Sequence, residues 1–427
     1  MRIRALALLG EPPSWDASAL RDTMERWTSE LAERARSVSS SGIEVWTLRI
    51  SLPGLPGDDP SIVERVASAA PEGALVSIGH TRRPEVLEAA ASRGLYAYMP
   101  ISAPEDAAAA AAAVYRVARG NPEDATRVAV SAGGHLLSTP YFPISSALPG
   151  RILFAASLLY PSDVDPSSPS RSVRSIFRAA ERAAPWASFD YSLSPWMEES
   201  VAALIERAYG VAVGSPGSLH AVRELNRIIR SSAGPSAIGF NEVMLPVEED
   251  SVLKRMAREG SLRASDLLRL ASVCVAGVDM AVVSAGPDGL RRFLLDARAV
   301  SASAGKPIGV RLIPVDEPPG TPIDLGRFGT ATAIGIRCRW TIRDPGAATE
   351  KLISGTLLTR ACAALPTRRS RSTRSSWPSE QPRGSCRSCA PHSRRPRPTG
   401  PRWTSWGSWA ASRSSGPPPS PTRSTLT

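Results

Sequence analysis

The first 340 residues of this 427-residue chain predict an α/β fold. Short apolar segments alternate with amphipathic segments, which is typical of a mostly parallel sheet whose strands are joined by helical crossovers. Most of the apolar segments are β-branched or aliphatic, and they end at Gly, Pro or Ser. Ten such segments are many for an open sheet, so a closed or nearly closed α/β barrel is favoured.

The ten predicted strands are residues 3–9, 43–50, 74–78, 96–100, 127–131, 152–158, 188–193, 237–245, 280–284 and 307–314. The helices predicted between them show apolar side chains at helical spacing, as Trp27, Leu31 and Ala35 do in the first. These helices are residues 16–37, 84–92, 105–119, 170–184, 197–209, 218–230, 251–259, 263–273 and 286–303. In folds of this class, sites lie at the carboxyl ends of strands.

The charge of the chain is unevenly distributed. Residues 341–427 carry 15 Lys and Arg against three acidic residues, whereas residues 1–340 carry 36 basic and 37 acidic side chains. The net charge of +11 therefore comes from the last part of the chain, and the body offers no electrostatic footprint for nucleic acid. We predict one large domain over residues 1–340 and a non-globular tail over residues 341–427.

The tail is rich in Arg, Ser, Pro and Thr, and its composition cannot bury a core. Three interpretations are open: a disordered tail that binds nucleic acid, a plain disordered tail, or the product of a reading-frame shift. Disordered segments are poor in Trp, so the four tryptophans Trp377, Trp403, Trp406 and Trp409 favour the frame shift. We place the break between residues 335 and 365, where the α/β pattern is lost.

The rest of the composition indicates a cytoplasmic protein. Cys274 and Cys338 are the cysteines of the body, too few for a disulfide framework, and Cys386 and Cys389 in the tail lack a second pair at zinc spacing. The apolar start breaks at Gly10, which predicts a first strand rather than a signal peptide. No segment approaches the ~20 apolar residues of a membrane span.

Several segments carry a family resemblance. They are residues 139–143 (TPYFP), 189–195 (FDYSLSP), 239–250 (GFNEVMLPVEED), 272–280 (SVCVAGVDM) and 306–315 (KPIGVRLIPV). Their order and spacing resemble the domain of unknown function 711 family, also called uncharacterised protein family 0210, over about residues 1–335. That resemblance implies a fold similar to the ten-stranded α/β barrel of pyruvate formate-lyase-like enzymes, and no known reaction. Val275 departs from the family, which usually has Gly after the cysteine, and the tail replaces a short C-terminal segment.

Glycyl radical chemistry is not expected. It needs a barrel-centre cysteine and a glycine near the C-terminus, and the only loosely similar glycine, Gly120, follows an Ala-rich helix far from that end. Gly120 is better explained as the end of a helix. Cys274 is the one plausible cysteine of the body, and buried cysteines usually act as small hydrophobic residues.

Acidic and amide side chains at strand ends give the strongest indication of chemistry. Convergent carboxylates hold hard cations such as Mg²⁺ or Ca²⁺, or serve as general acid and base. The catalytic candidates are Asp190, Glu242 and Asp279, with Asn241 as a polar ligand-binding residue. Glu248, Glu249 and Asp250 are more simply explained as N-terminal residues of the helix that follows them.

Further candidates come from single residues with unusual surroundings. Arg311 lies in the middle of an apolar strand and needs either a structural carboxylate or an anionic ligand. His80 lies at a strand end beside two arginines, and His135 follows a Gly pair that forms no recognised phosphate-binding motif. The ligand-binding candidates are Thr139, Tyr141, Phe142, Asn241, Arg311 and His80.

The leading hypothesis is an enzyme-like α/β barrel that binds a small anionic molecule, with Arg311 holding the anion and Thr139–Phe142 lining the pocket. On this hypothesis, Arg311→Ala abolishes ligand binding while the fold survives. The alternative is a non-catalytic ligand-sensing or oligomeric interaction protein on the same fold. We expect a homo-oligomer that binds neither nucleic acid nor membrane. The residues name no cofactor, although the carboxylates are compatible with a divalent cation.

Overall fold

The structure is a computed structural model, and it describes residues 1–133 and 138–336. These residues form a mixed α/β fold, as the alternating pattern predicts. The ten α-helices of the described residues are α1 (Ala17–Ser39), α2 (Pro60–Ala69), α3 (Pro84–Ser92), α4 (Asp106–Gly120), α5 (Pro169–Ala183), α6 (Val201–Tyr209), α7 (Ser218–Ser232), α8 (Ser251–Arg258), α9 (Ala264–Ala271) and α10 (Pro287–Ala304).

The strands of the described residues are mostly short and buried. They are β1 (Arg2–Leu9), β2 (Val45–Ser51), β3 (Ala74–His80), β4 (Tyr96–Ile101), β5 (Val128–Ala132), β6 (Leu153–Leu159), β7 (Ser188–Asp190), β8 (Met244–Pro246), β9 (Ala276–Ser284), β10 (Ile308–Val315), β11 (Pro322–Asp324), β12 (Thr330–Thr332) and β13 (Ile334–Gly335).

One large sheet organises these strands. Its strands are hydrogen-bonded in the order β13-β9-β10-β5-β4-β3-β2-β1-β6-β7, and β8 pairs with β9. β1 to β5 are parallel to one another, while β6 and β10 run antiparallel to their neighbours β1 and β5. β6 and β7 are parallel, as are β8, β9 and β10. Two sets of parallel strands thus run in opposite directions. The bridges Phe189–Ala237 and Leu193–Val243 connect the chain around β7 to the segment that leads into β8.

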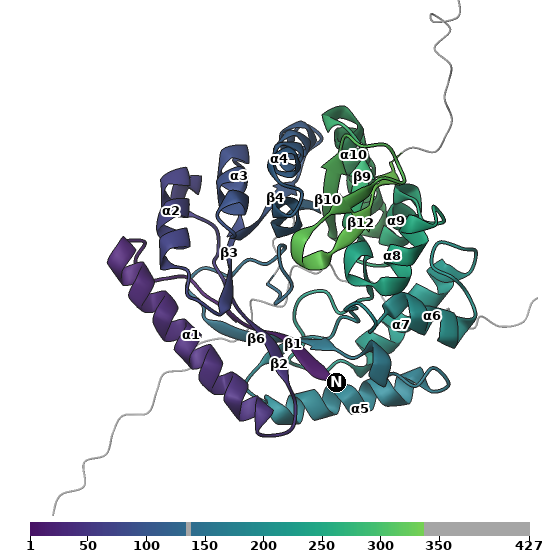
Figure 1. Cartoon of the computed structure of the whole chain (residues 1–427). Coiled ribbons are helices and arrows are strands. Elements are labelled where there is room, and N and C mark those ends of the chain that lie inside the picture. The colour runs from purple at the N-terminus through teal and green to yellow at the C-terminus, as the bar shows by residue number, and fades with distance from the viewer. Residues whose placement is uncertain (134–137, 337–427) are drawn as a thin grey trace, which may run out of the picture. The chain divides into compact units, whose positions relative to one another are not determined.

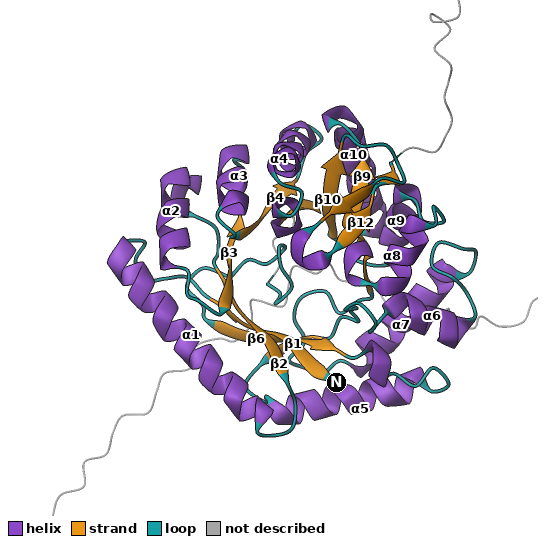
Figure 2. Cartoon of the chain, viewed as in Figure 1, coloured by secondary structure: helices purple, strands orange, loops and turns teal. Residues whose placement is uncertain are grey.

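Helices lie on the outer face of this curved sheet and loops lie on its inner side (Figures 1 and 2). α1 turns Leu20, Trp27 and Leu31 toward the core, which is the helical spacing expected from the sequence. The Ala-rich helix α4 packs closely against α3 and α10, because its small buried side chains allow close approach. Within the described residues no helix is long and apolar enough to cross a membrane.

The predicted elements differ from the structure in a few places. Of the strand predicted over residues 237–245, only the end is regular, as β8 (Met244–Pro246), since Gly239 and Asn241 have positive φ angles that interrupt an extended backbone. The helix predicted from residue 197 begins at Val201, because the Ser200 hydroxyl caps it by accepting from the Ala203 N–H. α2 and the two-stranded hairpin β11–β12 were not predicted. His135 and the predicted tail lie outside the described residues.

Candidate functional site

A cavity of about 200 Å³ lies among side chains from both sets of strands. β1, β3 and β4 contribute Arg4, Leu75 and Tyr96 from their amino-terminal halves, whereas Ser194 follows the carboxyl end of β7. The sequence led us to expect a site at carboxyl ends alone. The structure differs because the two sets run in opposite directions, so carboxyl ends of one set lie beside amino ends of the other.

The walls of the cavity are largely apolar. Aromatic rings supply much of the surface, and the rings of Tyr96 and Phe142 lie 5.2 Å apart between centroids. The loop that carries Phe142 enters the space between the strands, and its Phe142–Pro143 peptide bond is cis. The Tyr141 hydroxyl donates to the Ser194 Oγ at 3.0 Å, which ties this loop to the segment after β7.

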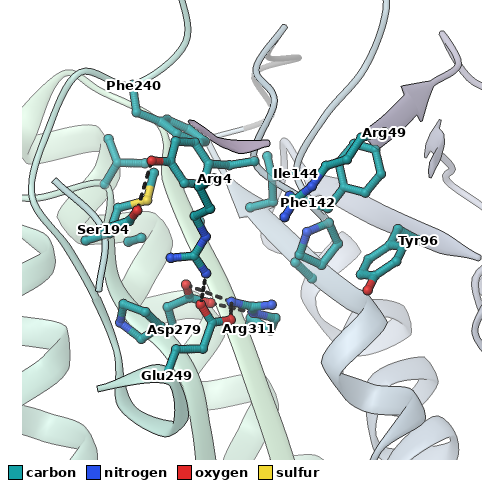
Figure 3. Close-up of a pocket in the computed structure, with 18 of the residues that line it drawn as sticks. Arg4, Arg49, Tyr96, Phe142, Ile144, Ser194, Phe240, Glu249, Asp279 and Arg311 are labelled. Atoms are coloured by element: carbon teal, nitrogen blue, oxygen red, sulfur yellow. Dashed lines mark hydrogen bonds and ion pairs between the residues drawn. The ribbon is translucent and has the colours of Figure 1, made fainter. Parts of the chain in front are cut away.

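Four charged side chains form a network on one wall, shown in Figure 3. Arg311 Nε donates to Asp279 Oδ1 at 2.6 Å, and its Nη2 donates at 3.0 Å both to Asp279 Oδ2 and to Glu249 Oε1. The other oxygen of Glu249 accepts from Arg4, which also donates to the Pro195 carbonyl. Each carboxylate oxygen in this network therefore has a guanidinium partner.

The network has opposite effects on its two carboxyls. Burial alone would raise the pKa of Glu249, but the charges of Arg4 and Arg311 outweigh it and lower that pKa below its ordinary value. Burial raises the pKa of Asp279, and Arg311 only partly opposes this effect. The side chain of Asp279 is 16% exposed and that of Glu249 is 6% exposed, so Asp279 is the more accessible carboxyl of the cavity.

Arg49 is a buried cation that lacks a carboxylate partner among the described residues. Its Nε donates to Thr47 Oγ1 at 3.1 Å and its Nη1 to the Pro140 carbonyl at 3.0 Å. Its guanidinium lies 5.2 Å from the centre of the Phe142 ring, and the residue is only 9% exposed. Burial and the charge of Arg4 together lower the pKa of Arg49 to about 10. Figure 3 places Arg49 beside Phe142, away from the Glu249 network.

The β11–β12 hairpin contributes a further arginine. Arg327 lies in the turn between these strands, lines the cavity and donates from Nη2 to the Tyr96 hydroxyl at 2.7 Å. The neighbouring Phe328 packs edge-to-face on Trp196, and its carbonyl accepts from Lys254 Nζ at 2.7 Å. These contacts hold the hairpin against the wall that carries the charged network.

The predicted site residues fall into separate groups. Asp279, Arg311, Tyr141 and Phe142 line the cavity. Thr139, Asp190 and Asn241 come together instead in a second, buried cluster. Of the three acidic residues expected at the helix that follows them, Asp250 caps α8 by accepting from Val252 and Leu253 N–H groups, whereas Glu249 turns into the cavity.

Asp190 is the centre of the second cluster. Its Oδ2 accepts from Thr139 Oγ1 at 2.7 Å and from the Phe240 N–H at 2.9 Å. Its Oδ1 accepts from Ser192 Oγ at 2.6 Å and from the N–H groups of Ser192 and Asn241. Burial raises the pKa of Asp190, while these donors oppose the rise. Asn241 Oδ1 in turn accepts from the Tyr191 N–H.

Glu242, His80 and Cys274 do not line the cavity. Glu242 is buried and pairs with Arg230 and with Lys306 Nζ, the latter at 2.8 Å. His80 Nδ1 lies 3.3 Å from Ser146 Oγ, and burial lowers its pKa. Burial raises the pKa of the Cys274 thiol to about 12, which keeps it protonated. Within the described residues, no three His, Cys, Asp or Glu side chains converge as a metal site would require.

Sequence reasoning missed Arg4 and Arg49. Both stand inside apolar strands, as Arg311 does, so the same pattern could have identified them. In β2 the polar residues Thr47, Arg49 and Ser51 alternate with apolar ones, which is the pattern of a strand with one exposed face, so Arg49 resembles an ordinary outward-facing residue. The partner of each arginine depends on strands that are distant in sequence.

The fold and the cavity define an α/β protein with an arginine-rich internal site. Residues 171–324 match the family model described as "Uncharacterised ACR (DUF711)", which confirms the predicted resemblance to that family. The matched segment contains Glu249, Asp279 and Arg311, while Arg4 and Arg49 precede it.

Curated relatives agree with the family match. A UPF0210 protein of Sulfurisphaera tokodaii is 37% identical over 138 residues, covering 31% of each chain. A UPF0210 protein of Pyrobaculum arsenaticum is 34% identical over 154 residues, covering 35% of this chain and 34% of the relative. The chain thus matches about a third of the length of these relatives.

A search of solved structures found dihydropteroate synthase from Thermus thermophilus in complex with 6HMPPP. It is 16% identical, covers 74% of this chain and 89% of its own, and has a TM-score of 0.17. A score this low supports no argument about fold or function.

Proposed function

We propose that this protein is a ten-stranded α/β barrel, of the pyruvate formate-lyase-like type, that binds a small organic anion in its central cavity through Arg49. The strand order supports a closed ring, since β1–β5 and β6–β10 form two parallel sets of opposite direction. The bridges between the chain around β7 and the segment before β8 lie where such a ring would close.

The observation that supports an anionic ligand is the unpaired charge of Arg49. A guanidinium removed from water loses several kcal/mol of hydration unless a counter-charge and hydrogen bonds replace it. Thr47 and Pro140 supply only neutral oxygens to this group. An anionic ligand in the cavity would supply the missing charge, and the planar N–H donors of arginine suit a carboxylate or a phosphate.

Arg311 was the anion-binding residue predicted from the sequence, and the contacts now favour a different role. Its donors face Asp279, Glu249 and the Thr126 carbonyl, which is the structural alternative considered for a mid-strand arginine. The apolar walls around Arg49 suit a ligand whose remaining atoms form a small apolar or aromatic body. Asp279, with its raised pKa, is the acid or base candidate that borders this ligand.

The alternative is a non-catalytic ligand sensor on the same fold. It is favoured by the carboxylate oxygens of Glu249 and Asp279, each of which already accepts a guanidinium hydrogen bond. A tightly bound anion that is recovered chemically unchanged after long incubation supports the sensor. Chemical conversion of that anion by the wild-type protein, but not by an Asp279→Asn variant, supports an enzyme.

Isothermal titration calorimetry with acetate, benzoate, phosphate and phenyl phosphate tests the binding proposal. We expect at least one of these anions to bind, and Arg49→Met to weaken it by about a hundredfold, as loss of a buried charge pair does. Arg49→Lys should retain part of the affinity. Arg178→Met is the matched control, because Arg178 is exposed on α5. Absence of any binding, or equal binding by Arg49→Met, contradicts the proposal.

A further inference from the structure

The cavity carries an excess of positive charge. Four arginines line it, Arg4, Arg49, Arg311 and Arg327, but only two carboxylates, Glu249 and Asp279. Arg4 and Arg311 are bonded to those carboxylates. The two remaining guanidiniums, the buried Arg49 and the exposed Arg327, form no ion pair with any described residue, so both are available to an anionic ligand.

The two unpaired guanidiniums border one end of the cavity. Arg327 bonds to the hydroxyl of Tyr96, whose ring packs on Phe142, and Phe142 in turn lies under the guanidinium of Arg49. Tyr96 and Phe142 thus form an aromatic floor with an arginine at each side. Figure 3 shows Arg49, Phe142 and Tyr96 grouped apart from Glu249 and Asp279. A ligand group placed here meets two cations without facing the carboxylates directly.

We propose that the ligand carries a dianionic phosphate group, bound between Arg49 of β2 and Arg327 of the β11–β12 hairpin. This inference rests on the proposed function and names the ligand class of that site. A phosphate monoester has a charge near −2 at pH 7 and three acceptor oxygens, which matches two guanidiniums and their free N–H groups. The lining has arginines and no lysine, and arginine binds phosphate in a planar, two-point geometry.

The origin of the two arginines has a structural consequence. Arg49 belongs to the main sheet, whereas Arg327 belongs to a hairpin that forms a separate two-stranded sheet within the described residues and is held by Lys254, Trp196 and Tyr96. A phosphate bridging both arginines links the hairpin to the sheet. Arg327 is exposed, so it can be replaced without placing a new group in the core.

Titrations with phenyl phosphate and phenyl sulfate test the inference, because the two probes have the same shape and differ in charge. Phenyl sulfate stays a monoanion, whereas the second phosphate pKa is near 6. At pH 7.5 we expect phenyl phosphate to bind about tenfold more tightly, as an added charged hydrogen bond allows. At pH 5.0 that advantage should disappear. Changes in the protein itself would alter both probes alike.

Arg327→Met provides the second measurement. We expect it to weaken phenyl phosphate about tenfold and phenyl sulfate much less, with Arg327→Lys in between. Equal affinities of the two probes for the wild-type protein at pH 7.5 would contradict a dianionic ligand. So would an Arg327→Met variant that binds both probes as tightly as the wild-type protein does. If benzoate still binds through Arg49 in that case, the proposed function survives. If no anion binds at all, both proposals fail together.

Discussion

Two buried polar clusters adjoin each other at Thr139 and Pro140 and differ in how their charges are satisfied. The cluster around Asp190 surrounds one carboxylate with five neutral donors, all from the protein. The cavity cluster contains Arg49, a buried cation whose protein partners are neutral carbonyl and hydroxyl oxygens. The first cluster is complete without a ligand, whereas the second, on our proposal, needs an anionic ligand to supply its counter-charge.

This difference separates structural from binding roles. A buried polar group in an apolar strand always needs a partner, so sequence alone marks Asp190 and Arg49 equally. The identity of the partner decides the role. Asp190 fixes the loops of Thr139 and Phe240 to the end of β7, while Arg49 keeps donor capacity toward a cavity.

The largest expected effect comes from Asp190→Ala. Removal of this carboxylate leaves five buried donors without an acceptor, and each such group costs about 1–3 kcal/mol. We expect the free energy of unfolding to fall by at least about 5 kcal/mol, measured by urea denaturation. Asp296→Ala, at an exposed position of α10, should change little.

Asp190→Asn keeps an acceptor and tests the catalytic role that the sequence suggested for Asp190. We expect this variant to bind the anion of the proposed site as tightly as the wild-type protein does. A variant that stays as stable as the wild-type protein but no longer binds or converts the ligand would show that Asp190 has a functional role rather than a structural one.

The next effect concerns Arg311→Met. The sequence alone predicted that replacing this arginine would abolish binding and spare the fold. Because Arg311 pairs with both Glu249 and Asp279, its loss leaves two buried carboxylates with too little positive charge. We expect a loss of about 4 kcal/mol in unfolding free energy, as for other broken buried pairs. Unchanged stability with lost anion binding would restore the earlier assignment.

The sequence predicted the alternation of strands and helices well, because aliphatic runs and helical spacing are local signals. It also singled out Arg311 and Asp279, which line the cavity, since charges inside apolar runs are conspicuous. It could not separate Asp190 from them, because three of the five donors to Asp190 come from segments about 50 residues away in the chain. Short-range patterns also miss the β11–β12 hairpin, whose strands have only three residues each.

Glu248 is a third case to compare with Asp190 and Arg49, because its carboxyl group has no hydrogen-bond donor among the described residues and does not line the cavity. It is 1% exposed, and neither oxygen accepts a hydrogen bond from the described residues. Lys254 Nζ lies 3.4 Å from Oε2 and bonds instead to the Phe328 carbonyl. Burial raises the pKa of Glu248 to about 7, and Lys254 only partly opposes this effect. The folded protein therefore holds a proton here that the unfolded chain releases at lower pH.

The sign of the resulting pH dependence follows from that proton. Between the ordinary glutamate pKa of 4.5 and about 7, the folded state binds more protons than the unfolded state, so this group lowers stability as pH rises. Glu248→Gln removes the dependence, and at pH 8 we expect it to exceed the wild-type unfolding free energy by up to about 3 kcal/mol. At pH 4.5 the two should be nearly equal. Urea denaturation at both pH values measures this difference, with Glu72→Gln as the exposed control. A Glu248→Gln variant that is less stable at pH 8 would mean that the ion pair with Lys254 outweighs the cost of burial, and that the hairpin depends on a charged Glu248.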